Sequence, residues 1–157
     1  FDFESSINTA DHLARKGDNL VTIGINPSHA STAYGYIQYD ENSEEDHIDA
    51  YRVRTFAEKP HKKLAERFIE SGDFVWNAGM FFWRVSTLMD SLEKKMPELK
   101  HSLDKISNLL AENLSIDDVW KMIKPESIDY GLLEKSENIF VKSSILSHPC
   151  PCGIWLV

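Results

Sequence analysis

A strand–helix–strand pattern between residues 51 and 84 constrains this chain most. Residues 51–56 alternate apolar and polar side chains, which is typical of a half-buried strand. Residues 61–71 carry an apolar stripe at helical spacing, and a glycine follows at position 72, where helices often end. Residues 74–85 form a dense apolar run and are expected to be a core strand. The pattern predicts an α/β fold, in which ligands commonly bind outside the strand ends.

The chain before this unit continues the same alternation. Residues 3–16 have helical periodicity, and residues 20–25 are a short apolar run rich in β-branched side chains, as expected for a strand buried on both faces. Residues 34–39 predict a strand that pairs with residues 51–56. The acidic segment 40–49 between them is predicted to be a solvated hairpin loop without chemistry.

Helices are predicted to cluster between residues 86 and 135. Ser86 and Ser127 are candidate N-caps, because a serine oxygen can accept from the free N–H groups of a first helical turn. The predicted elements are helices at 87–96, 99–110, 116–123 and 127–135, then a last strand at 139–141.

Composition and charge exclude several classes of protein. The 157 residues carry 17 Lys+Arg against 25 Asp+Glu, a net charge of −8, which argues against nucleic-acid binding. No apolar run is long enough to span a membrane. The only two cysteines, Cys150 and Cys152, do not have a zinc-site spacing, and we expect a reduced, cytoplasmic protein.

Four motifs together resemble the mannose-1-phosphate guanylyltransferases, and the resemblance covers about residues 3–142. They are, in order, LVTIGINPSHASTAYGYI, FAEKP, WNAGMFFW and SIDYGLLEK. The resemblance implies the second half of a Rossmann-like nucleotidyltransferase domain, with a mixed sheet flanked by helices. It also implies transfer of GMP from GTP to mannose 1-phosphate, which gives GDP-mannose and pyrophosphate. Residues 143–157 depart from the family and form an atypical C-terminal tail.

The resemblance assigns five residues to the sugar-phosphate pocket. Gly35 matches a glycine whose backbone approaches the sugar, and Glu58 matches a glutamate that accepts hydrogen bonds from sugar hydroxyls. Lys59 matches the lysine that neutralises the sugar phosphate, and it is the expected catalytic residue. Asn77 and Gly79 match residues that close the pocket. These residue types suit a sugar phosphate, because a sugar needs carboxylate and amide partners, and a phosphate needs a cation.

Other family features are partial or absent. Asp129, in the SIDY motif, is a sixth candidate for substrate binding. The glycine-rich loop for the GTP phosphates and both metal-binding aspartates of the family have no counterpart. Residues 9–12 (TADH) resemble one metal motif, but they are expected on a helix surface. Mg²⁺ is therefore expected in the intact family enzyme, without a complete site in this chain.

We expect this chain alone to be inactive, and several alternatives remain open. The partners are GTP and mannose 1-phosphate, together with a second copy or a missing N-terminal half that would cover an exposed sheet edge. Alternatively, the chain is a non-catalytic sugar-phosphate-binding or subunit-pairing module, or part of a pyrophosphorylase for another sugar 1-phosphate. The sequence leaves open whether the parent protein carries an isomerase domain.

Overall fold

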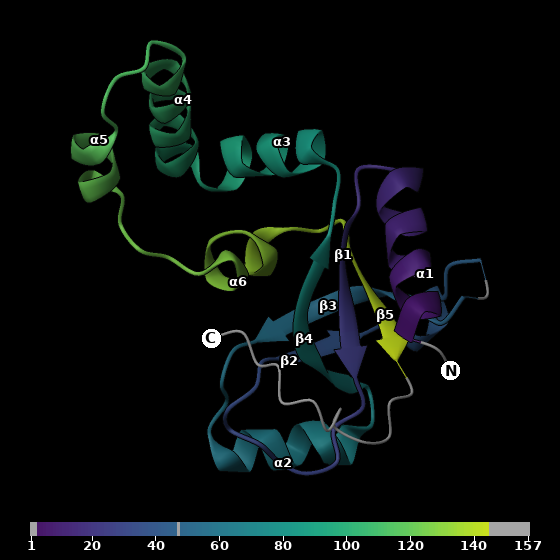
Figure 1. Cartoon of the computed structure of the whole chain (residues 1–157). Helices are drawn as coiled ribbons and strands as arrows, with labels where there is room; N and C mark the ends of the chain where they lie inside the picture. Colours follow the sequence, from purple (N-terminus) through teal and green to yellow (C-terminus); the bar gives the residue numbers. More distant parts are fainter. Residues whose placement is uncertain (1–2, 47, 145–157) are drawn as a thin grey trace. The chain divides into compact units, whose positions relative to one another are not determined.

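The chain folds into two compact units, which we describe in turn (Figure 1). The structure is a computed structural model, and it describes residues 3–46 and 48–144. The first unit combines the described residues up to Trp83 with those from Asn138 onward. The second unit is Arg84–Glu137.

The first unit contains the predicted alternation of helices and strands. Its helices and strands lie within two residues of the predicted bounds, except at the C-terminal ends of β4 and β5. They are α1 (Phe3–Lys16), β1 (Leu20–Ile25), β2 (Tyr36–Tyr39), the 3-10 helix η1 (Glu41–Ser43), β3 (Ala50–Ala57), α2 (Lys62–Ser71), β4 (Phe74–Phe82) and β5 (Ile139–Ser144).

The five described strands form one mixed sheet that closes on itself in the order β1-β4-β2-β3-β5. β1 and β5 are parallel, and the other four pairings are antiparallel. The predicted hairpin of β2 and β3 across segment 40–49 is confirmed. The expected exposed sheet edge is wrong for the described strands, because β5 lies between β1 and β3 and gives each of the two a second neighbour.

Side chains of the first unit pack into core clusters, which include one inside the barrel, one under α1 and one under α2. Inside the barrel, Ile37, Val75 and Val141 pack with half-buried aromatic and aliphatic side chains of β2 and β3. The helix α1 covers β1 and β5, and α2 covers β4 (Figure 1). The cluster under α1 consists of Ala10, Leu13, Ala14, Val21, Ala50 and Phe140. The cluster under α2 consists of Tyr36, Ala65, Phe74 and Trp76.

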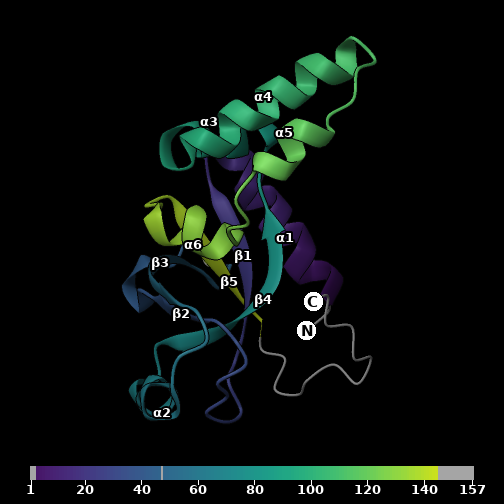
Figure 2. The same cartoon turned by 90° about the vertical axis from the view of Figure 1, so that its left-hand side faces the viewer.

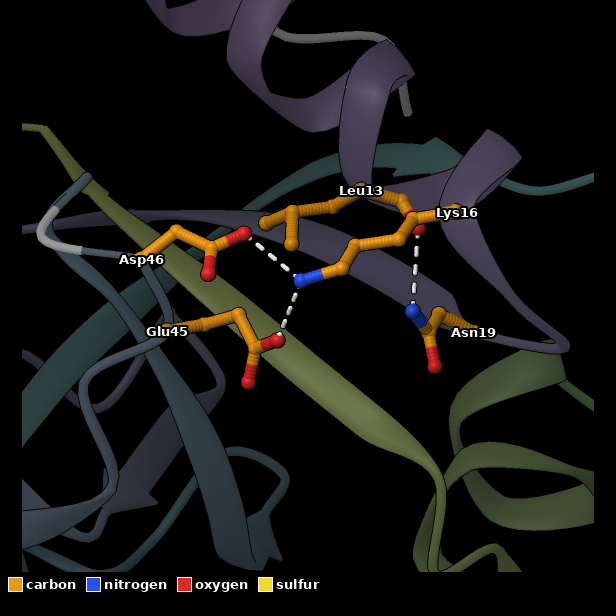
Figure 3. Close-up of polar contacts among 5 residues, drawn as sticks. All are labelled: Leu13, Lys16, Asn19, Glu45 and Asp46. Carbon is orange, nitrogen blue, oxygen red and sulfur yellow. Dashed lines mark hydrogen bonds and ion pairs between the residues drawn. The ribbon is translucent and has the colours of Figure 1, made fainter.

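Two residues of the acidic segment, Glu45 and Asp46, form ion pairs with the end of α1 (Figure 3). The Lys16 ammonium lies 2.7 Å from a Glu45 carboxylate oxygen and 2.6 Å from one of Asp46. The hydrogen bond to Asp46 raises the pKa of Lys16 most, and the hydrogen bond to Glu45 raises it further. Next to it, the Asn19 side chain donates to the Leu13 carbonyl over 2.9 Å and caps the helix end.

The second unit contains the predicted cluster of helices (Figure 2). Ser127 is confirmed as an N-cap, since its oxygen accepts from the Tyr130 N–H. Ser86 is not one, because the helix begins at Val85, two residues before its predicted start, and its N-cap is Arg84. The elements are α3 (Val85–Lys95), α4 (Pro97–Ala111), α5 (Asp117–Met122), α6 (Ile128–Gly131) and the 3-10 helix η2 (Leu133–Lys135).

Residues 145–157, most of the atypical tail, include Cys150 and Cys152 and lie outside the described residues. Among the helices of the described residues, none has the length and apolar character that crossing a membrane requires.

Gly24 lies where the barrel interior has no room for a larger residue. A Cβ atom there would collide with Cγ2 of Val75 and would lie 2.7 Å from Cγ2 of Val141. Both are short, branched side chains of the interior, so Gly24→Ala should lower the free energy of unfolding by about 1–3 kcal/mol. Denaturant unfolding measures this, with Gly17→Ala as the control, because a Cβ at Gly17 meets nothing closer than 3.5 Å. Equal stability of both variants would contradict the packing.

Asp73 should make the free energy of unfolding depend on pH in the acidic range. Its carboxylate accepts from Ser71 Oγ over 2.6 Å and from Gln38 Nε2 over 2.7 Å, and these bonds lower its pKa. A carboxyl group with a lowered pKa in the folded state stabilises above its unfolded pKa, and this contribution disappears as the pH falls through the folded value. Asp73→Asn should therefore cost up to about 1 kcal/mol at neutral pH and progressively less below about pH 4.

Unfolding curves between pH 2 and 7 provide the measurement. Asp118→Asn, at an exposed position in α5, is the control. A difference between Asp73→Asn and wild type that stays constant with pH would refute the assignment.

Candidate functional site

A bulge in β4 organises the candidate site. In the ladder between β1 and β4, Thr22 is opposite Phe81, whereas Gly24 is opposite Asn77. Two residues of β1 thus span the same distance as four residues of β4, and the surplus lies between Asn77 and Phe81. A bulge interrupts the ladder and re-aims side chains, and bulges are common next to functional sites.

The carboxamide of Asn77 is held from two sides. Its Oδ1 accepts from the Gly79 N–H over 3.0 Å and faces Thr22 Oγ1 at 3.1 Å. The same Thr22 hydroxyl lies 3.1 Å from the Met80 carbonyl and so bridges the bulge. Gly79 has φ 69°, which glycine adopts at no steric cost, and the space where its Cβ would be is open. The turn that holds Asn77 therefore favours a glycine at this position.

Gly35, Glu58 and Asn77 come together although they lie on three different segments. The Asn77 N–H donates to the Gly35 carbonyl over 2.8 Å. A Cβ built on Gly35 would lie 2.5 Å from Glu58 Oε2 and 3.5 Å from Asn77 Cβ. The backbone of Gly35 is thus flanked by an acidic and an amide side chain, and only a residue without a Cβ leaves the carboxylate in place.

Glu58 and Lys59 form an ion pair at the end of β3. The Lys59 Nζ lies 3.5 Å from Glu58 Oε1, and the side chains are 66% and 19% exposed for Lys59 and Glu58, respectively. Lys59 has φ 45°, directly before Pro60. The other described non-glycine residues with positive φ are Asp or Asn, which tolerate this region well. Strained backbone of this kind occurs often at ligand sites. Here the strained residue is Lys59, which follows Glu58 directly and carries an accessible positive charge.

An aromatic cluster fixes the loop that leads into Gly35. Trp76 is 5% exposed, and the rings of His29 and Tyr34 pack against it at centroid distances of 5.1 and 4.8 Å. The Tyr36 hydroxyl donates to the Ser31 carbonyl of the same loop over 3.0 Å. Trp76 is thus part of the core cluster under α2. Its buried indole N–H has no hydrogen-bond partner among the described residues.

The six residues predicted from the sequence separate into two groups. Gly35, Glu58, Lys59, Asn77 and Gly79 all belong to the first unit. Asp129 belongs to the second unit, where it lies in the first turn of α6. A shared role of Asp129 with the others stays a prediction, and so does the function of all six residues.

Thr22 is the residue that the sequence analysis missed. It stands inside the otherwise apolar run LVTIGI and is fully buried. A hydroxyl in such a run was the available signal, because a buried polar group needs a hydrogen-bond partner. Its partner, Asn77, is 55 residues away along the chain, so the sequence alone could not connect them.

The candidate site offers no ligand set for a metal ion. Within the described ranges, no group of three or more His, Cys, Asp or Glu side chains could hold one. Asp11, in the motif resembling a metal site, lies on α1 and pairs with Arg15 at 2.7 Å. A depression of about 410 Å³ on the same helix includes none of the predicted site residues; it is lined by Glu4, Ser5, Asn8, Thr9, His12 and Ile48.

Comparison with known sequences identifies similar proteins over most of the chain. A model of the nucleotidyl transferase family matches residues 1–121. A mannose-1-phosphate guanylyltransferase of Escherichia coli is 36% identical over 144 residues, which are 88% of this chain and 31% of that protein. One of Klebsiella pneumoniae is 34% identical, again over 88% of this chain and 30% of its own length. The chain thus spans less than a third of these relatives.

Solved structures extend the similarity to the fold. A structure described as mannose-1-phosphate geranyltransferase from Thermus thermophilus has a TM-score of 0.78, with 29% identity, and the match covers 92% of this chain and 41% of that one. A mannose-6-phosphate isomerase from Helicobacter pylori has a TM-score of 0.75, with 27% identity over 90% of this chain and 55% of its own. The α/β fold with a sheet flanked by helices is shared with both.

Gly35→Ala should separate the site from the stability of the fold. The added Cβ would meet the far end of a flexible glutamate, so the Glu58 carboxylate moves and the free energy of unfolding changes by less than about 1 kcal/mol. A crystal structure or carboxyl chemical shifts of the variant would report the movement. An unmoved carboxylate, or a variant that unfolds, would contradict the close approach at Gly35.

Proposed function

Because this chain belongs to the nucleotidyl transferase family, we propose that it supplies the sugar-phosphate-binding part of an enzyme that transfers GMP from GTP to mannose 1-phosphate. The observation that carries this proposal is the convergence of Gly35, Glu58 and Asn77, with Lys59 beside them. The names of the relatives support the choice of substrates.

The side chains suit the two ends of a sugar phosphate. The Glu58 carboxylate only accepts hydrogen bonds, and sugar hydroxyls are donors for it. Phosphate is repelled by that carboxylate and attracted by an ammonium group, so the phosphate end belongs beside Lys59. The side chain of Lys59 is 66% exposed and can turn from Glu58 to an incoming anion. The pocket would thus orient the sugar at Glu58 and Asn77.

The proposed reaction needs positioning more than covalent chemistry. A phosphate oxygen of mannose 1-phosphate attacks the α-phosphorus of GTP, a new P–O bond forms, and pyrophosphate leaves. Lys59 would balance the charge of the attacking phosphate and hold it in line. We expect Mg²⁺ in the intact enzyme, where it would balance the charge of the triphosphate. The described residues do not fit such an ion, so we assign it no ligand here.

The proposal leaves part of the family's activity to other residues. Because the chain spans less than a third of its relatives, we expect it to bind sugar phosphate without turning it over. The choice of mannose over another sugar, the partners of the chain and its cytoplasmic location stay predictions.

Calorimetric titration of the chain with mannose 1-phosphate tests the proposal. Lys59→Ala should weaken binding about tenfold or more, because it removes a charged hydrogen bond to the phosphate. Lys62→Ala is the matched control, since Lys62 is an exposed lysine three residues further on, at the start of α2. Its affinity should equal that of wild type.

Two results would contradict the proposal. One is a folded chain that does not bind mannose 1-phosphate, and the other is equal weakening by both lysine variants. A parallel titration with glucose 1-phosphate decides the sugar: tighter binding of glucose 1-phosphate would move the proposal to a different sugar-nucleotide pyrophosphorylase.

A further inference from the structure

The carboxylate of Glu58 lies between a glycine backbone and a cation. Its Oε2 lies against Gly35, since a Cβ built on that glycine would be 2.5 Å from this oxygen. Its Oε1 lies 3.5 Å from the Lys59 Nζ. The Glu58 side chain is only 19% exposed, and a carboxylate that has lost most of its water needs a cation or hydrogen-bond donors nearby. Lys59 supplies such a cation.

The backbone at Lys59 explains how two consecutive residues form this pair. In a continued strand, consecutive side chains point to opposite faces, so the charges of residues 58 and 59 would be separated. However, β3 ends at Ala57, and Lys59 has φ 45°. The chain therefore turns directly after Glu58, and the two charged groups meet. A left-handed lysine persists only where the surrounding structure fixes it, so the fold itself holds the pair together.

The ion pair affects phosphate esters with and without hydroxyl groups differently. A phosphate monoester has its second pKa near about 6, so at pH 8 it is a dianion. At Lys59 it would break the ion pair and bring negative charge beside Glu58. An ester without hydroxyl groups gives the carboxylate nothing in exchange for the lysine. A sugar phosphate brings hydroxyl donors, and an ionised carboxylate accepts hydrogen bonds from them.

We propose that Glu58 is a specificity-determining residue, which excludes phosphate esters without hydroxyl groups from Lys59 and admits sugar phosphates. This assignment rests on the proposed function, in which Lys59 receives the phosphate. Glu58 pairs with the ammonium until a hydroxyl of the ligand donates to the carboxylate. The same carboxylate thus lowers the affinity for a plain phosphate ester and raises the affinity for a sugar phosphate.

Titrations with mannose 1-phosphate and with methyl phosphate at pH 8, followed by phosphorus NMR, test this inference. Methyl phosphate is the probe because it carries the same charged group and no hydroxyl on its methyl group. Glu58→Ala should tighten binding of methyl phosphate about two- to fivefold, the effect of removing a partly exposed ion pair. It should weaken binding of mannose 1-phosphate at least about threefold, because the lost hydrogen bond to a charged acceptor outweighs the freed lysine.

Two further variants complete the experiment. Glu58→Gln keeps the shape of the side chain and removes its charge, so it should also tighten binding of methyl phosphate, and it provides a second test if Glu58→Ala does not fold. Glu66→Ala removes an exposed carboxylate from α2 and is the control. Its affinities for both ligands should equal those of wild type.

Changes of the same sign for both ligands overturn the inference. If both bind more weakly to a folded Glu58→Ala chain, the carboxylate merely supports the fold or the position of Lys59. If both bind more tightly, Glu58 repels phosphate and accepts nothing from the sugar. Unchanged affinity for either ligand would also refute it. These results leave the proposed function intact if wild type binds mannose 1-phosphate, whereas a folded wild-type chain that binds none would overturn both.

Discussion

The pairing of β1 with β4 is the constraint on which the rest of the first unit depends. β4 pairs with β2 through its first residues and with β1 through the rest, and Trp76 faces a partner in both, Tyr36 and Ile25. The strand must therefore turn between its two neighbours for the barrel to close. The bulge after Asn77 lies at this turn, because surplus residues let a strand bend and twist.

The candidate site is a consequence of that bend. A regular ladder would have used the backbone groups near Asn77 for pairing and would have placed the side chains in strict alternation. In the bulge, the Thr22 hydroxyl meets the Met80 carbonyl, and the side chain of Asn77 meets the Gly79 N–H. The hydrogen bond from the Gly79 N–H therefore both closes the turn of the bulge and orients the Asn77 carboxamide.

Polar side chains of the candidate site lie next to the apolar interior of the barrel. The interior contains Ile37, Val75 and Val141, and the two valines leave no room for a Cβ at Gly24. Next to this apolar filling lie the half-buried Glu58 and Asn77. Hydrogen bonds are stronger beside a low-dielectric interior than in water, so a few groups suffice to hold a ligand there. The accessible cation of Lys59 stands where solvent and a charged ligand can reach it.

The sequence by itself determined most of the helices and strands, and its motifs suggested the candidate residues through their resemblance to a family. Local periodicity, the glycine after α2 and the serine before α6 act over a few residues, so they can be recognised in the sequence alone. At Ser86 the predicted boundary was wrong by two residues, because the helix begins at Val85 and its N-cap is Arg84. Only the tertiary structure decided that the sheet closes, that β4 bulges and that Thr22 meets Asn77. The physical reason is that these features come from pairing between strands far apart in sequence, and strand pairing depends on which partners the chain finally brings side by side.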